Sequence, residues 1–211
     1  MLATSVAPEN DVLVELAEGL GIRTFRGDEN DVLGRHLALA ETFGADHLVR
    51  VTGDNPLTDV PLIESLVAAH LEADSDYTYV PGDALLMGIL SEVISRQALA
   101  TSHRDGEDRH RSELVTLYIK EKPDTFRILR AELPAELYRP EYRLTVDEPD
   151  DLVLMERIFD KLYRDRLYRS DAVLQTIDAI RLLDEEPQLA EINAHIRHSA
   201  ANFRSVALDN D

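Results

Sequence analysis

The sequence predicts an α/β protein with a mostly parallel sheet. Segments whose apolar residues recur at helical spacing alternate with short segments rich in β-branched and aromatic residues. This alternation is typical of a sheet that is covered by helices. The chain has 211 residues, of which 44% are hydrophobic, so it can bury a substantial core. Its length favours one domain, or one domain with an appendage.

The first half of the chain predicts three helices, each followed by a strand. The helices are expected at residues 8–20, 30–43 and 61–70, and the strands at 22–25, 47–52 and 76–80. Gly21 and Gly44 follow the first two helices, where glycine readily takes the left-handed conformation that ends a helix. Pro61 suits the first turn of the third helix.

The second half continues the alternation and then becomes helical. Strands are expected at residues 88–95, 126–133 and 142–146, helices at 96–103 and 112–122, and a charged turn at 104–111. After Asp147, helices are expected at 149–163, 170–183 and 187–198. We therefore predict an α/β domain over residues 1–163 and a helical C-terminal extension over residues 164–211.

Composition excludes several kinds of partner and site. The chain carries 22 basic and 41 acidic residues, a net charge of −19, which disfavours nucleic acid and anionic membrane surfaces as partners. A small anionic ligand would need a local arginine cluster or a divalent cation to reverse this field. There is no cysteine, which excludes disulfides and thiolate chemistry. No apolar run is long enough to span a bilayer and no targeting segment is evident, so we expect a cytoplasmic protein.

Asp54 is the first candidate site residue. It lies in Gly-Asp-Asn-Pro, directly after the strand expected at residues 47–52. In open α/β sheets, ligands bind beyond the carboxyl ends of parallel strands, which favours a metal-binding role. The alternative is a turn in which the Asp54 side chain only accepts backbone N–H groups.

Asp147 is the second candidate. It ends the expected strand 142–146, immediately before a helix with Pro149 in its first turn. Glu148, Asp150 and Asp151 can serve the helix start, which leaves Asp147 free for another role. The alternative is a solvated acidic first turn. Because Mg²⁺ is usually held by one or two carboxylates together with substrate phosphates, the pair Asp54 and Asp147 predicts a magnesium site.

Four motifs in order resemble the cytidylyltransferase family that includes spore coat polysaccharide biosynthesis protein F and is related to CMP-N-acetylneuraminate and CMP-KDO synthetases. The motifs are residues 25–63, MGILSEVISRQAL, SELVTLYI and YRLTVDEPDDL. The resemblance covers about residues 2–163, and PQLAEINAH is similar to the family's C-terminal end. It implies a three-layer, Rossmann-like nucleotide-diphospho-sugar transferase fold. It also implies transfer of CMP from CTP to a sugar or sugar acid, with Mg²⁺ held by Asp54 and Asp147.

The resemblance also assigns binding residues. Arg26, Gly27, Asp31 and Arg35 match positions near the nucleotide, although Asp31 and Arg35 could instead form a helix-surface ion pair. Gly88 and Glu92 match positions that line the sugar site, although Glu92 could be a solvent-facing strand residue. Met87, Leu90 and Leu114 depart from the family pattern, which leaves the acceptor sugar open.

The front of the family fold has no match in this sequence. Relatives begin with a strand, a glycine-rich phosphate loop and a helix, whereas this chain opens at LATS, which resembles the end of their second strand. We therefore expect a longer natural protein, and a non-catalytic relative that acts as a binding or assembly subunit is the alternative to an enzyme. The resemblance also makes a homodimer plausible.

Overall fold

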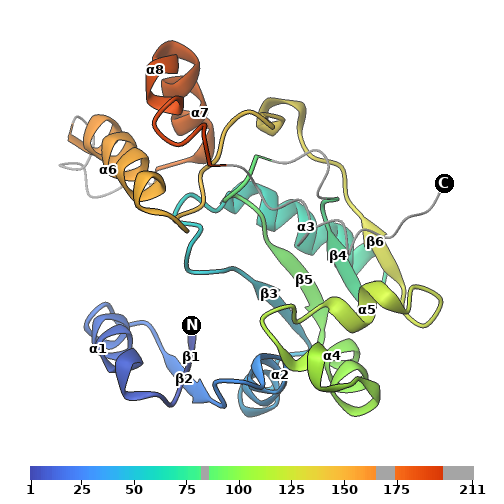
Figure 1. Cartoon of the computed structure of the whole chain (residues 1–211). Helices are drawn as coiled ribbons and strands as arrows, with labels where there is room; N and C mark the ends of the chain where they lie inside the picture. The colour runs from blue at the N-terminus through green and yellow to red at the C-terminus, as the bar shows by residue number, and fades with distance from the viewer. Residues whose placement is uncertain (82–85, 165–173, 197–211) are drawn as a thin grey trace.

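The structure is a computed structural model that describes residues 1–81, 86–164 and 174–196 (Figure 1). The strands are β1 (Leu2–Ser5), β2 (Thr24–Gly27), β3 (His47–Arg50), β4 (Tyr77–Tyr79), β5 (Glu92–Ser95) and β6 (Ile128–Arg130). The helices are α1 (Asp11–Gly19), α2 (Val32–Phe43), α3 (Val60–Glu72), α4 (Arg96–Asp105), α5 (Leu117–Glu121), α6 (Pro149–Arg164), α7 (Thr176–Glu185) and α8 (Pro187–Ala190). Helices and strands alternate through most of the chain, as the sequence predicted.

The strands form two separate sheets. β1 and β2 pair in parallel, and the other four strands follow the order β3-β5-β4-β6. β5 is antiparallel to both of its neighbours, while β6 is parallel to β4. β3, β4 and β6 therefore share one direction, and the mixed α/β sheet is dominated by parallel strands, which confirms the predicted fold class.

Helices cover both faces of the four-stranded sheet (Figure 1). On one face, α2, α4 and α5 enclose a core that includes Leu33, Leu99 and Ile119. On the other face, α3 packs against β4 and β5 in a second core that includes Leu66 and Val93. This second core continues through α6 and α7 to α8, so widely separated parts of the chain share it.

Side-chain caps lie at the starts of the central helices, close to the starts that the sequence predicts. Asp31 accepts the backbone N–H of Gly34 at the start of α2, and Asp59 accepts that of Leu62 at the start of α3. Gly44 ends α2 with φ +62°, in the left-handed region that favours glycine. These caps explain why the boundaries of α2 and α3 could be predicted closely.

Several expected elements are shorter than predicted. The expected strand at 142–146 is an extended segment with a single bridge, between Met87 and Arg143. The expected helix at 112–122 is reduced to α5, and the expected helix at 187–198 ends at Ala190 and continues as turns. Residues 170–173 and 197–198 of the expected C-terminal helices lie outside the described residues.

The C-terminal helices pack directly on the rest of the protein. Ile180 and Leu183 of α7 are buried in the same core as Leu57 and Leu62. The boundary at residues 163 and 164 stays a prediction. None of the helices in the described parts of the chain is long and apolar enough to cross a membrane.

Candidate active site

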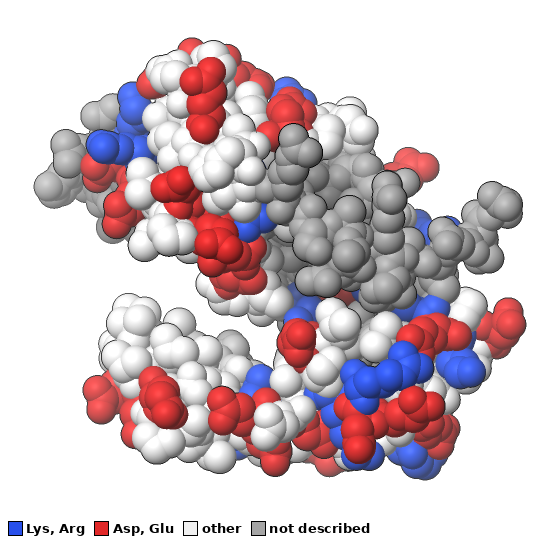
Figure 2. Space-filling view, viewed as in Figure 1, with Lys and Arg blue, Asp and Glu red and all other residues white. Residues whose placement is uncertain are grey.

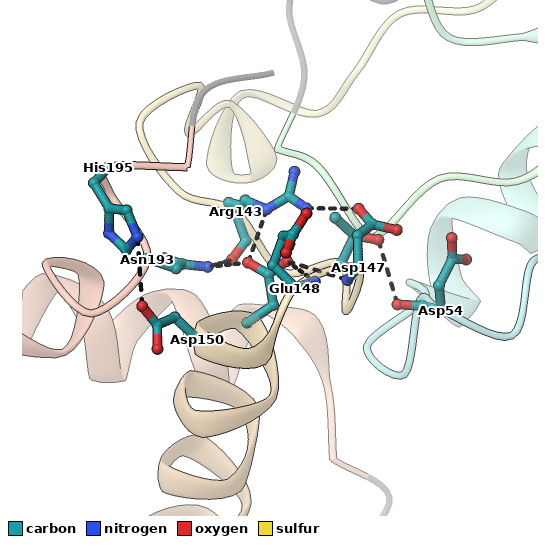
Figure 3. A network of polar contacts seen from close by, with 9 residues as sticks. Asp54, Arg143, Asp147, Glu148, Asp150, Asn193 and His195 are labelled. Carbon is teal, nitrogen blue, oxygen red and sulfur yellow. Dashed lines mark hydrogen bonds and ion pairs between the residues drawn. The ribbon is translucent and has the colours of Figure 1, made fainter. Parts of the chain in front are cut away.

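Two segments that are far apart in the sequence meet beside the four-stranded sheet. The backbone N–H of Val146 donates a hydrogen bond of 2.8 Å to the carbonyl of Asp54, and the Thr145 hydroxyl lies 3.4 Å from the same oxygen. Figure 3 shows the carboxyl groups of Asp54 and Asp147 on the same side of this contact. The two candidate metal ligands therefore lie on adjoining stretches of backbone.

The Asp54 side chain is exposed and available. β3 ends at Arg50, and Asp54 lies in the following turn, where the N–H of Asn55 donates to the carbonyl of Thr52. Within the described part of the chain, no hydrogen bond or ion pair engages the Asp54 carboxylate. The alternative in which this side chain accepts backbone N–H groups of the turn is therefore not what the structure contains.

Asp147 is held by an arginine and remains half-exposed. Nη2 of Arg143 lies 2.6 Å from Oδ2 of Asp147, whose side chain is 46% exposed. Arg143 itself is buried, and its Nε and Nη2 also donate to the carboxylate of Asp151 at 2.8 Å. Arg143 thus fixes the orientation of Asp147 while leaving much of that carboxylate accessible.

Asp151 performs the capping that was expected of the acidic residues at the start of α6. Its carboxylate is buried and accepts the backbone N–H groups of Asp147 and Glu148 at 3.1 and 3.0 Å. Burial alone would raise the pKa of Asp151, but the hydrogen bonds from Arg143, Asn193 and the backbone outweigh it and lower the pKa to about 2. The Asp147 side chain does not cap helix α6, as the sequence predicted.

Asn193 completes the network and was missed by the sequence reasoning. Its amide nitrogen donates to Oδ1 of Asp151 at 2.8 Å and to the carbonyl of Arg143 at 3.0 Å, and the residue is buried (Figure 3). A polar side chain in PQLAEINAH, which resembles the family's C-terminal end, was the only available sequence signal.

The backbone of Gly88 packs closely against the extended segment that leads to Asp147. It has φ +98°, and a Cβ atom built on it would lie 2.2 Å from the carbonyl carbon of Leu144 and 2.3 Å from the nitrogen of Thr145. The neighbouring Met87 carbonyl accepts the N–H of Leu144 at 2.7 Å. Only glycine allows this close approach, so Gly88 positions the segment that carries Asp147.

The predicted nucleotide-binding residues lie where β2 meets α2. Arg26 anchors the loop after β1: it donates to the carbonyls of Ser5 and Ala7 and pairs with Asp11 at 2.6 Å. A Cβ atom on Gly27 would lie 2.9 Å from Cγ of Arg35, so the arginine stem packs against the Gly27 backbone.

Asp31 does not form the ion pair with Arg35 that was the alternative to nucleotide binding. Its Oδ1 caps α2 and its Oδ2 lies 2.7 Å from Nε2 of His103. Nη1 of Arg35 donates to the carbonyl of Asp28 at 3.1 Å, whereas its Nε is buried without a partner among the described residues. Arg35 therefore keeps more unused donors than Arg26.

Glu92 is not the solvent-facing strand residue that was the alternative to sugar binding. Its carboxylate accepts hydrogen bonds from the hydroxyls of Tyr77 and Thr116, and it pairs with Arg50 and Lys120 at 3.2 Å each. Burial would raise the pKa of Glu92, but the charges of Lys120 and Arg50 and the bond from Tyr77 lower it to about 2. A sugar hydroxyl would have to compete with these donors.

The geometry fits a metal that shares its ligands with a substrate. Across the described residues, no three His, Asp or Glu side chains gather closely enough to hold a metal ion by themselves. The carboxylates of Asp54 and Asp147 lie on adjoining stretches of backbone, and two carboxylates are the number of protein ligands that Mg²⁺ often has when phosphates complete its coordination.

Comparison with known proteins decides the family. The family model for cytidylyltransferases matches residues 1–197. The chain belongs to the cytidylyltransferase family. Membership makes this cytidylyltransferase a nucleotidyltransferase whose substrates are a nucleotide and a sugar, in a family that uses a divalent metal.

Individual relatives agree with this assignment. The cytidylyltransferase is 34% identical to the uncharacterized protein MJ1063 of Methanocaldococcus jannaschii over 98% of its own length and 80% of that protein. It is 35% identical to the spore coat polysaccharide biosynthesis protein SpsF of Bacillus subtilis over 76% of its own length and 67% of that protein. A solved cytidylyltransferase from Leptospira borgpetersenii shares its fold, with a TM-score of 0.79 and 22% identity over 92% of this chain and 79% of that one.

Proposed function

We propose that this cytidylyltransferase transfers CMP from CTP to a sugar or sugar acid, with release of pyrophosphate, for the synthesis of a surface polysaccharide or glycan. Asp54 and Asp147 would hold Mg²⁺. The observation that carries the proposal is the hydrogen bond between the Val146 N–H and the Asp54 carbonyl, because it brings these two carboxylates to adjoining stretches of backbone. Similarity to SpsF supports the polysaccharide role.

The roles of the surrounding residues follow from their contacts. A bound Mg²⁺ would neutralise phosphate charge and align the attacking and leaving oxygens. Arg143 keeps the Asp147 carboxylate oriented, and Asp151 holds Arg143 in place from the buried side. Because these groups are fixed before substrate binds, little reorganisation is needed at the reacting phosphate.

Arg35 is the more suitable of the two candidate arginines for contacting the nucleotide. All three guanidinium nitrogens of Arg26 already have partners within the protein, whereas only Nη1 of Arg35 has one among the described contacts. An arginine with free donors can pair with a phosphate in a bidentate manner. Glu92 would fix Arg50 and Lys120 next to the proposed sugar site. Its own carboxylate oxygens would accept hydrogen bonds from sugar hydroxyls.

The test is pyrophosphate release from CTP with a panel of sugars, sugar acids and sugar phosphates, compared among variants. Asp54→Asn and Asp147→Asn should each lower the rate by about 100-fold or more, since each removes a ligand of the metal that stabilises the transition state. Asp150→Asn is the matched control, because Asp150 lies on the same helix start but contacts His195 at 3.4 Å. It should retain most of the activity.

Metal binding gives a second readout that does not depend on the acceptor sugar. Mn²⁺, used as a spectroscopic substitute, should bind in the presence of CTP and lose affinity in Asp54→Asn and Asp147→Asn. If neither Mn²⁺ nor CTP binds the unaltered chain, the proposed reaction is wrong for this polypeptide. A non-catalytic binding or assembly subunit is then the better description.

A further inference from the structure

Three side chains from separate elements form a chain of hydrogen bonds on the α3 face of the four-stranded sheet. Nδ1 of His47, at the start of β3, lies 3.0 Å from Nε2 of His70, in the last turn of α3. Nδ1 of His70 lies 2.8 Å from the hydroxyl of Thr78 on β4. His70 and Thr78 are fully buried, whereas His47 is exposed. We call these three residues the histidine link, because they join α3 to two strands.

The number of bound protons decides whether the histidine link can form. Two ring nitrogens at 3.0 Å form a hydrogen bond only when one of them carries a proton and the other offers a lone pair. This arrangement is available when both imidazoles are neutral and when one of them is protonated, because the Thr78 hydroxyl can either donate to His70 or accept from it. When both imidazoles are protonated, two N–H groups face each other and the bond is lost. The link therefore tolerates one added proton but not two.

The acidic groups nearest to His70 are already neutralised. Asp74 and Asp76, which lie between α3 and β4, both pair with Arg127, which precedes β6. The two carboxylates favour a proton on His70, whereas the charge of Arg127 opposes it. The pKa of His70 lies below its ordinary value of 6.5, mainly because the ring is buried and next because His47 lies beside it.

The surroundings of His47 are neutralised in the same way. Asp46 precedes His47, and its carboxylate pairs with Arg96 of α4 at 2.8 Å. The register partner of His47 on β5 is Ser95, which is uncharged. Figure 2 shows that acidic and basic side chains are interspersed over the surface around α4 and α5. The charged groups that the structure describes on both sides of the link therefore come in opposite pairs.

We propose that the histidine link is an acid-sensitive switch, which holds α3 against β3 and β4 at neutral pH and opens when both imidazoles are protonated. His47 can turn into solvent, but a charged His70 gains water only if the last turn of α3 moves away from the sheet. β3 and α3 are the elements directly before and after the turn that carries Asp54, so opening loosens both supports of that turn. Histidines commonly provide such switches because they change charge near neutral pH. The inference does not use the proposed reaction.

The direction of the pH effect follows from the lowered pKa of His70. Below pH 6.5 the unfolded chain binds a proton at this histidine more readily than the folded chain does. The stability that neutral His70 contributes is therefore present above about pH 6.5 and is lost as the pH falls through the folded pKa.

The experiment follows the 211-residue chain by NMR between about pH 7.5 and about pH 5, the range in which histidines titrate. The ring signals of His70 should show a neutral imidazole at the upper end of this range. The backbone N–H of Ser75 donates to the carbonyl of His70 at 3.0 Å, so it reports on the last turn of α3. After correction for the intrinsic effect of pH on hydrogen exchange, its protection should fall about tenfold or more at the lower end.

His47→Gln is the informative variant. A glutamine amide can donate or accept a hydrogen bond without taking up a proton, so the Ser75 amide should keep most of its protection at the lower pH. The titration midpoint of His70 should also rise, because a neighbouring positive charge is removed. His36→Gln is the matched control: burial also lowers the pKa of His36, but its ring bonds the Val32 carbonyl on its own helix. This variant should lose Ser75 protection as the unaltered protein does.

Any of four results would overturn the proposal. Two concern the unaltered chain: a protonated His70 ring at the upper end of the pH range, or Ser75 protection that does not change with pH. The third is a loss of protection in His47→Gln as large as in the unaltered protein. The fourth is disappearance of the loss in His36→Gln, which would assign the transition to His36. None of these measurements requires CTP or a sugar, so failure here is distinguishable from failure of the proposed function.

Discussion

Gly88 shows how one residue without a side chain can set the position of a segment that carries a candidate site residue, Asp147. Gly88→Ala places a methyl group into the backbone of Leu144 and Thr145 at a positive φ. We expect the free energy of unfolding to fall by about 3 kcal/mol or more, because the backbone strain of alanine at a positive φ adds to the steric overlap of its methyl group. Gly53→Ala is the control, since a Cβ atom there meets nothing within 4 Å. Urea denaturation of both variants measures the difference, and equal stability would contradict the role assigned to Gly88.

Glu92 gives a second prediction at this scale. Glu92→Gln removes the charge that Arg50 and Lys120 share, and it leaves two partly buried cations without compensation. We expect the free energy of unfolding to fall by about 3 kcal/mol. Glu113→Gln is the control: Glu113 is exposed, and its substitution should change the free energy of unfolding very little. If Glu92→Gln folds as stably as the unaltered protein and loses only sugar affinity, Glu92 serves the ligand alone.

The predictability of single residues depended on where their partners lie. The positions of Asp54 and Asp147 beyond a strand or extended segment could be predicted because local features, a turn and a helix start, fix them, while their role as metal ligands stays a prediction. The environment of Glu92 could not be predicted, because Tyr77, Arg50 and Lys120 come from three other elements that only the fold brings together. Asn193 was missed for the same reason.

Helix α6 carries a prediction about pH. The pKa of Asp151 is lowered from 3.8 to about 2, so the stability it contributes is present above about pH 4 and is lost as the pH falls towards about 2. The amount is about 2 kcal/mol. Asp151→Asn should therefore show a flatter decline of unfolding free energy over this range than the unaltered protein. Urea titrations between about pH 5 and pH 2 test it, and parallel curves would refute it.

Element boundaries were predictable where a local cap decides them. The start of α2 near Asp31 and its end at Gly44, and the start of α3 near Pro61, were predicted from the sequence and are confirmed, with Asp59 as the observed cap of α3. The segment 142–146 has the composition of a strand, but its hydrogen bonds go to Asp54 and Met87 in an irregular arrangement instead of to a neighbouring strand. Composition cannot reveal the absence of a regular partner.

At the scale of the whole molecule, the shared core predicts a single unfolding transition. Ile180 on α7 is buried in the same cluster as Leu57 and Leu62. Ile180→Ala should destabilise the entire chain by about 2–4 kcal/mol, with circular dichroism and tyrosine fluorescence changing together. Arg181→Ala, at a neighbouring exposed position, should have little effect. Two separate transitions would instead support an independent unit beginning at residue 164.

The overall topology was the part least accessible to sequence reasoning. Alternation of helices and strands gave the fold class, but the order β3-β5-β4-β6 and the reversed direction of β5 depend on contacts between distant segments. Nothing in EVIS distinguishes an antiparallel strand from a parallel one, because both alternate in the same way.

The distance in sequence between Asn193 and its two partners has a consequence for synthesis of the protein. Arg143 and Asp151, which orient Asp147, are tied together by a side chain that follows them by 50 and 42 positions. A nascent chain leaves the ribosome from its N-terminus, so the proposed metal site cannot take its final form until residue 193 has been synthesised. A polypeptide that ends before residue 193 would retain Asp54 and Asp147 and lack the side chain that ties Arg143 to Asp151.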